Sequence, residues 1–199
     1  LQELCASLHE VSSLPLWIGI DQEGGLVNRL KPIYGFADTK SHAYLGNQDD
    51  IELTYKQAKD IGSILREMHI TVNFAPVVDV AKEFNSSIIA KRERSFGSSS
   101  DLVYRHAKAY LRGLQSEGIW GCCKHFPGHG GVSIDSHVAQ PIDQRSFDDL
   151  DNPEDRAMFG EYLVKNLALY FDKYSSDLEA NVEEPEAAAE AEPGGPGTA

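Results

Sequence analysis

The chain has 199 residues, of which 41% are hydrophobic and 25% are charged. This composition is ordinary for one globular domain, and the length allows a sizeable core but falls short of the roughly 250 residues of a complete (β/α)8 barrel. The formal net charge is −13, and a field of that sign repels nucleic-acid phosphates, so a general nucleic-acid-binding role is not expected.

The cysteine count and the hydropathy pattern indicate the compartment. Cys5, Cys122 and Cys123 are odd in number and two of them are adjacent, which argues against a disulfide framework and favours a reducing, cytoplasmic location. We interpret Cys122 and Cys123 as small, buried strand residues. No apolar run is long enough to cross a bilayer, so no membrane partner is expected.

The chain begins with a helix and a strand. Apolar residues recur at helical spacing through Leu1–Val11, which we interpret as the end of a helix. Leu14–Ile20 is a short, nearly continuous apolar run, typical of a buried parallel strand. It ends at the polar turn 21–25, which contains two glycines.

A second helix and strand follow. Asp49 and Asp50 offer N-caps to a helix that extends to about His69. Its apolar face is predicted to consist of Ile51, Tyr55, Ala58, Ile61, Leu65 and Met68. Thr71–Val80 is predicted as the next strand, broken by Pro76.

The third unit repeats this order. Residues 99–101 are predicted to cap a helix that Gly118 terminates, and Ile119–Cys123 is predicted as a strand. The buried face of this helix is predicted to consist of Val103, Ala107, Tyr110, Leu111 and Leu114. A glycine- and histidine-rich loop follows the strand.

These strand–loop–helix units predict an α/β fold with a parallel sheet, either an incomplete (β/α)8 TIM-barrel-like domain or an open doubly wound sheet. Polar residues come just after each strand: Asp21, Asp79, then Lys124 and His125. In a barrel they would converge at one mouth. We assign 1–175 to the partial barrel, with a weaker helix over 154–172, and 176–199 to a disordered acidic tail rich in Ala, Glu, Pro and Gly.

Four motifs carry a family resemblance. Residues 124–137 read KHFPGHGGVSIDSH, 18–25 read IGIDQEGG, 73–80 read NFAPVVDV, and 93–97 read ERSFG. Together they resemble family 3 glycoside hydrolases of the β-N-acetylglucosaminidase kind. The resemblance implies retaining hydrolysis of terminal β-linked N-acetylglucosamine from muropeptide-like or chitin-like saccharides, without a metal or organic cofactor.

The resemblance also implies the roles of individual residues. Asp135 and His137 would form an acid/base dyad, in which an imidazole can give and take a proton near neutral pH. Substrate would be bound by Asp21, Arg29, Arg94, Lys124 and His125. We interpret His129 as a residue that shapes the loop, and Asp79 as a brace of the barrel mouth.

The carboxylate nucleophile of the family is harder to place. Its motif resembles S-D-D-L, and residues 174–179, YSSDLE, are the nearest string, with Asp177 as the candidate after a shift of one residue. The interval from His137 is short for the intervening elements, and the family's first strand is not found before Leu1. The chain is therefore expected to be truncated relative to the family.

Two alternatives remain open. A truncated or degenerate barrel would bind sugar, or nothing, without turnover, and a partner chain or self-association would be needed to complete the ring. A metal-dependent hydrolase would use His125, His129, Asp135 and His137 as ligands. Metal analysis and turnover of a chromogenic N-acetylglucosaminide separate these alternatives.

Overall fold

The structure is a computed structural model, and it describes residues 1–81, 88–126 and 129. The predictions for Asp135, His137 and Asp177 lie outside the described residues. So do the helix expected over 154–172 and the boundary between 1–175 and 176–199.

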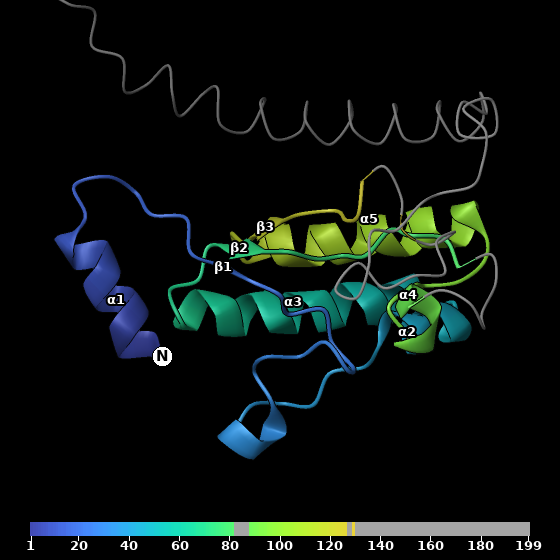
Figure 1. The fold of residues 1–199 in the computed structure, drawn as a ribbon, viewed down its shortest axis with the longest axis horizontal. Helices are drawn as coiled ribbons and strands as arrows, with labels where there is room; N and C mark the ends of the chain where they lie inside the picture. Colours follow the sequence, from blue (N-terminus) through green and yellow to red (C-terminus); the bar gives the residue numbers. More distant parts are fainter. Residues whose placement is uncertain (82–87, 127–128, 130–199) are drawn as a thin grey trace, which may run out of the picture. The chain divides into compact units, whose positions relative to one another are not determined.

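Helices and short strands alternate along the described chain (Figure 1). In order they are α1 (Gln2–Val11), β1 (Gly19–Ile20), the 3-10 helix η1 (Pro32–Tyr34), α2 (His42–Gln48), α3 (Ile51–Glu67), β2 (Val72–Asn73), α4 (Ile88–Lys91), α5 (Ser100–Ser116) and β3 (Trp120–Gly121). The sequence did not predict η1, α2 or α4. Among these helices none is long and apolar enough to cross a membrane.

The strands form a parallel sheet in the order β1-β2-β3. Gly19 pairs with Val72, which pairs with Trp120. Parallel pairing resumes further along, where Val77 and Lys124 form an isolated bridge. The prediction of a parallel α/β sheet is thus confirmed, and the three strands occur in the predicted places.

The three strands are shorter than predicted. In the second, Pro76 has no N–H to give to a ladder and separates β2 from the bridge at Val77, with a cis peptide bond between Ala75 and Pro76. The backbone carbonyl of Ile18 accepts from Thr71 and Val72, which marks where the pairing with β2 starts.

Helices α3 and α5 were predicted well. The Asp50 side chain accepts hydrogen bonds from the backbone N–H groups of Glu52 and Leu53, both at 3.0 Å, and so caps α3 as predicted. Gly118, with φ of +78°, follows α5 as the expected stop. All five residues of the predicted α5 face are buried, whereas Ile51 on the predicted α3 face is 42% exposed.

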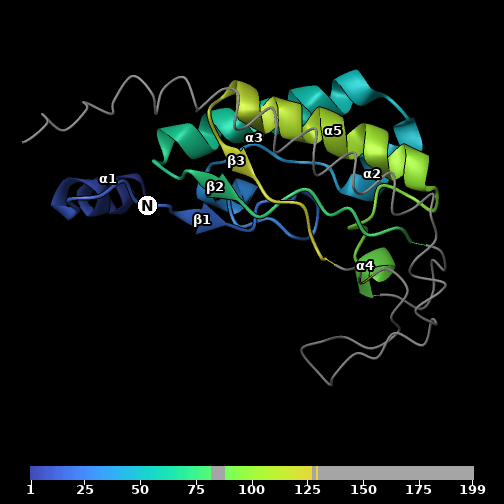
Figure 2. The same cartoon turned by 90° about the horizontal axis from the view of Figure 1, so that it is seen from above.

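These two helices pack against each other and cover one face of the sheet (Figure 2). Alternate strand residues point to opposite faces, so Gly121 lies on the helix-covered side, where an added Cβ would collide with Leu111 of α5. The core between these layers includes Ala58, Ile61, Leu65, Tyr110 and Leu114.

The opposite face of the sheet is exposed among the described residues. Trp17 is 75% exposed and Phe74 42% exposed, and Gly19 and Cys122 are also exposed. Trp17 stacks on Trp120 with ring centroids 5.9 Å apart. In a closed barrel this face would line the filled interior.

That exposure corrects two predictions. Leu14–Ile20 is not a fully buried strand, because Leu14 and Trp17 are exposed. Cys122 is exposed and Cys123 is half-buried, so the pair is not buried as predicted. The helix predicted over 1–11 is confirmed as α1, in which Cys5 is buried while Leu1, Leu4 and Leu8 are exposed.

Candidate active site

The turn after β1 is held rigidly by buried hydrogen bonds. The Gln22 N–H donates to Asn73 Oδ1 at 3.0 Å, and Asn73 Nδ2 donates back to the Gln22 carbonyl at 2.9 Å. The Tyr110 hydroxyl of α5 lies within hydrogen-bonding distance of the carbonyls of Gln22 and Glu23. Residues from β2 and α5 therefore fix where the side chains of this turn emerge.

Glu23 is the centre of the charged cluster at this end of the sheet. Its side chain is 2% exposed. Arg94 donates to both carboxylate oxygens, from Nε at 2.9 Å and from Nη2 at 2.8 Å. Lys124 Nζ lies 2.5 Å from Glu23 Oε1 and 2.8 Å from Asp21 Oδ1. Two cations and two carboxylates thus meet beyond the carboxyl ends of β1 and β3.

The charge of Glu23 depends on these partners. Burial by itself raises the pKa of the Glu23 carboxyl, but the hydrogen bonds from Arg94 and Lys124, with the charges of the same two residues, outweigh it and lower the pKa below its ordinary value. Glu23 is therefore a buried, ionised and fully partnered carboxylate near neutral pH.

Asp79 organises the loop after β3. Its Oδ2 accepts from the backbone N–H of His125 at 3.2 Å and lies 2.6 Å from His125 Nδ1. Its Oδ1 accepts from the backbone N–H of His129 at 2.5 Å. The peptide bond between Lys124 and His125 is cis. These contacts agree with the interpretation of Asp79 as a brace of the mouth.

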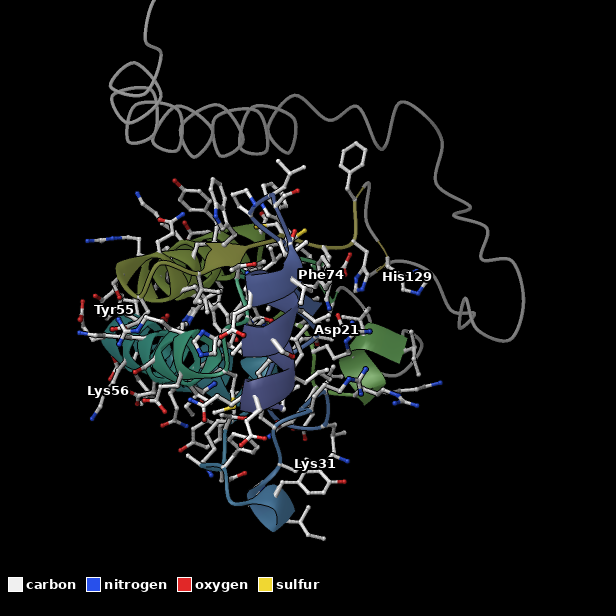
Figure 3. The ribbon with its side chains drawn as sticks, turned by 90° about the vertical axis from the view of Figure 1, so that its left-hand side faces the viewer. Asp21, Lys31, Tyr55, Lys56, Phe74 and His129 are labelled. Atoms are coloured by element: carbon white, nitrogen blue, oxygen red, sulfur yellow. The ribbon has the colours of Figure 1, made fainter. Side chains whose placement is uncertain are left out.

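Four of the five predicted sugar-binding residues come together. Asp21, Lys124, Arg94 and His125 are linked directly or through Glu23, and Arg94 Nη2 lies 3.1 Å from His125 Nε2. Figure 3 shows Asp21 and His129 on the side of the sheet away from Tyr55 and Lys56 of α3. This clustering confirms the geometric expectation that the polar residues after each strand share one mouth.

Arg29 does not join this cluster within the described residues. It is exposed, and its described hydrogen bond is from its backbone N–H to Gln22 Oε1 at 2.9 Å. Its predicted role in substrate binding stays a prediction, as do those of Asp135, His137 and Asp177.

Sequence reasoning missed Glu23 and Gln22. A signal was present, because two cations expected in one mouth, Arg94 and Lys124, need a buried counter-charge, and Glu23 lies two residues from Asp21. Gln22 carried no comparable signal. Its amide accepts from the backbone N–H groups of Arg29 and Leu30, which closes the loop after the turn.

His42 of α2 is buried next to the residues that hold the charged cluster in place. It is 1% exposed, stacks on Phe96 and packs against Tyr110, and its Nε2 accepts from the backbone N–H of Val77 at 3.3 Å. Burial lowers the pKa of His42 to about 3, so the ring is neutral near pH 7. Nδ1 then carries the proton, and among the described groups it has no hydrogen-bond partner.

The described residues contain no group of three or more His, Cys, Asp or Glu side chains placed to hold a metal ion. Of the ligand set considered from the sequence, His125 and His129 are described, with ring centroids 5.9 Å apart. Asp135 and His137 lie outside the described residues.

Comparison with known proteins identifies the family of the chain. A family model described as the glycosyl hydrolase family 3 N-terminal domain matches residues 2–162. The chain belongs to glycosyl hydrolase family 3. The match includes all four motifs on which the resemblance was based.

Two relatives show how much of a family 3 protein is present. A β-hexosaminidase of Nitrosomonas eutropha is 38% identical over 160 residues, covering 77% of this chain and 44% of that protein. The β-hexosaminidase LpqI of Mycobacterium tuberculosis is 38% identical over 141 residues, covering 69% of this chain and 36% of that protein. The chain thus spans less than half the length of these curated relatives.

Solved family 3 structures share the fold. A β-N-acetylglucosaminidase from Paenibacillus sp. superposes with a TM-score of 0.70 at 38% identity, covering 75% of this chain and 28% of that chain. NagZ from Neisseria gonorrhoeae, in complex with N-trifluoroacetyl-D-glucosamine, gives a TM-score of 0.68 at 31% identity, covering 75% and 45%. The described residues are therefore an incomplete part of a TIM-barrel-like domain, as predicted.

Proposed function

We propose that this family 3 chain binds terminal β-linked N-acetylglucosamine at the mouth formed by Asp21, Glu23, Arg94, Lys124 and His125, and takes part in its hydrolysis. The observation that carries the proposal is the convergence of these charged groups beyond the strand ends. The relatives support the choice of sugar, because two of them are named β-hexosaminidases. The structure of NagZ was solved with an N-acylated glucosamine derivative, which supports the same choice.

Three members of the cluster keep some solvent exposure and suit the recognition of hydroxyl groups. The Asp21 side chain is 42% exposed and can accept hydrogen bonds from sugar hydroxyls, while Lys124 and Arg94, at 14% and 17%, can donate to them. Hydrogen bonds to charged groups are stronger and more directional than those between neutral groups, so a few of them orient a sugar ring.

The chemistry we propose is a two-step retaining reaction. His137, oriented by Asp135, donates a proton to the glycosidic oxygen while a carboxylate attacks the anomeric carbon and the leaving sugar departs. His137 then takes a proton from the water that releases the glycosyl group. Asp177 is the candidate nucleophile in this chain, and muropeptide-like or chitin-like saccharides are the proposed substrates.

The alternative is a chain that binds the sugar without turnover. One observation favours it: the string nearest to the S-D-D-L motif, at residues 174–179, supplies Asp177 only after a shift of one residue. The exposed sheet face with Trp17 and Phe74 also supports association with a partner chain or with a second copy.

Binding and turnover of the purified 199-residue chain test the proposal separately. We expect calorimetric titration to show binding of N-acetylglucosamine in preference to glucose, and we expect slow or no hydrolysis of an aryl N-acetylglucosaminide by the chain alone. Absence of sugar binding contradicts the proposed function. Robust turnover that both His137→Ala and Asp177→Ala abolish would reject the alternative and identify Asp177 as the nucleophile. Sedimentation of the same samples reports their association.

A further inference from the structure

We propose that Glu23 is the positioning residue of this mouth: its single buried carboxylate fixes the Lys124 ammonium and the Arg94 guanidinium, and through Arg94 it provides the donor that His125 Nε2 accepts from. The consequence for sugar affinity rests on the proposed function, whereas the consequence for His125 does not.

The position of the Glu23 carboxylate is set by its backbone. Its own carbonyl lies 3.1 Å from the buried Tyr110 hydroxyl, and its N–H donates to the Val27 carbonyl at 3.0 Å. The neighbouring Gln22 is tied to Asn73 of β2 at both its N–H and its carbonyl. A carboxylate anchored in this way is a fixed reference point for the side chains that bind it.

Both cations bind the Glu23 carboxylate, and among the described residues each has at least one N–H group without a hydrogen-bond acceptor. Arg94 Nη2 donates to Glu23 Oε1 and Nε to Oε2, which fixes the guanidinium plane. Among the described residues Arg94 Nη1 makes no hydrogen bond, and Lys124 uses two of its three donors, on Asp21 and Glu23. The remaining N–H groups are therefore held in known directions at the mouth.

The tautomer of His125 follows from what each neighbour can do. Arginine has donors only, so the contact of 3.1 Å from Arg94 Nη2 requires His125 Nε2 to accept. A carboxylate accepts at both oxygens, so the contact of 2.6 Å from Asp79 Oδ2 favours the proton on His125 Nδ1. Asp79 and Arg94 thus favour the same tautomer, and Glu23 supports it by holding Arg94 where Nε2 must accept.

Glu23 also keeps two like charges together. Lys124 Nζ and Arg94 Nη2 both contact Glu23 Oε1, at 2.5 and 2.8 Å, so the two cations lie close to each other in a largely buried place. Without the carboxylate they would repel each other, and at least one would move toward solvent. The loss of the Glu23 charge is thus expected to displace at least one of the two donors.

Glu23→Gln removes the charge while keeping the shape, and the chain offers a matched control. Glu117 is also a largely buried carboxylate, 10% exposed, paired with Arg66 at 2.8 Å and Lys59 at 4.0 Å, but it lies in the contact between α3 and α5. Glu117→Gln therefore removes a comparable ion pair that is not in the mouth. Glu23→Asp, which keeps the charge but shortens the side chain, is the second variant if Glu23→Gln does not fold.

The first measurement is the ¹⁵N spectrum of the His125 ring in the sugar-free, labelled 199-residue chain. We expect protonated Nδ1 and accepting Nε2 in the unsubstituted chain, and a clear change of the Nε2 signal in Glu23→Gln (or Glu23→Asp) but not in Glu117→Gln. An unchanged His125 Nε2 signal in the folded Glu23 variant would overturn the inference, as would an equal change in Glu117→Gln.

The second measurement is calorimetric affinity for N-acetylglucosamine, referred to the folded fraction of each variant. We expect Glu23→Gln to lose about tenfold or more, and Glu117→Gln to remain within about twofold. Equal affinities in a Glu23 variant and the unsubstituted chain would overturn the positioning of the cations. If the unsubstituted chain binds no sugar while the His125 Nε2 signal changes as expected, the proposed function fails and the inference about His125 stands.

Discussion

Lys124 and His129 lie five residues apart in the same loop but contribute to the mouth through different atoms. Lys124 donates from its side chain to Asp21 and Glu23. The described hydrogen bond of His129 is from its backbone N–H to Asp79, which any residue with an N–H would make. The two positions therefore separate a side chain that can bind sugar from a backbone that shapes the loop.

Substitution by alanine should distinguish them. Lys124→Ala is expected to weaken binding of N-acetylglucosamine about tenfold to hundredfold, because a hydrogen bond to a charged group contributes roughly 1.5–3 kcal/mol. His129→Ala keeps the N–H that Asp79 accepts and should lose less affinity. Calorimetric titration measures both, and the reverse order would show that the loop is assigned wrongly.

At the scale of elements, the contact between α3 and α5 depends on two glycines with different surroundings. A Cβ at Gly113 of α5 would collide with the Tyr55 carbonyl and lie 2.7 Å from the Ala58 Cβ on α3. A Cβ at Gly62 of α3 would meet Glu117 Cβ at 3.0 Å and Cγ at 3.3 Å, a tight contact that a shift of a few tenths of an ångström relieves. An added methyl group thus collides with backbone at Gly113 but makes only a tight side-chain contact at Gly62.

Gly113→Ala is accordingly expected to lower the free energy of unfolding by about 1–3 kcal/mol, because the helices must separate. Gly62→Ala serves as the matched control and should be nearly neutral, since alanine favours a helix by up to about 1 kcal/mol over glycine. Urea unfolding compares the two. Equal effects would mean that helix propensity, and not close packing, decides both positions.

At the scale of the whole molecule, buried ionisable groups make the fold sensitive to acid. The folded pKa of His42 is about 3, because burial lowers it from an ordinary value of 6.5; the Glu23 charge raises it, while the charges of Lys124, Arg94 and His106 lower it further. Between pH 6.5 and 3 the unfolded chain therefore binds a proton that folded His42 does not. Stability is lost as the pH falls through that window.

Glu23 acts in the same direction. Its pKa is lowered in the folded chain, because its hydrogen bonds and charged partners outweigh burial, so the unfolded carboxyl takes up a proton first as the pH falls. The stability that its charge contributes is present above the ordinary pKa of 4.5 and is lost below it. A fall in pH is therefore expected to destabilise both the buried surroundings of His42 and the charged cluster around Glu23.

We expect the free energy of unfolding in urea to fall by about 2 kcal/mol between pH 6.5 and 5 from His42 alone. His42→Gln should remove this contribution and give a shallower dependence on pH. His69→Asn, which removes an exposed imidazole at a position with φ of +58°, is the matched control. An identical slope in His42→Gln and the unsubstituted chain would contradict the expectation.

The local features of this protein follow from its sequence. The Asp50 cap, the buried face of α5 and the stop at Gly118 were predicted because caps and helical periodicity involve residues that are close together along the chain. The meeting of Asp21, Lys124 and His125 also followed, since polar residues after parallel strands share one edge of the sheet, whereas Arg94 was grouped with them by the family resemblance. The four motifs indicated the family, and the family match over residues 2–162 confirmed it.

The contacts that hold these parts together, and the burial of each face, depend on residues far apart in the chain. Glu23 is central because Arg94 and Lys124, 71 and 101 residues further along, both reach it, and no local pattern encodes such distant pairs. Trp17 and Cys122 had the hydrophobic character of buried strand residues, yet they lie on the exposed face of the described sheet. Burial depends on what packs against a strand, and the apolar pattern of the strand does not contain that information.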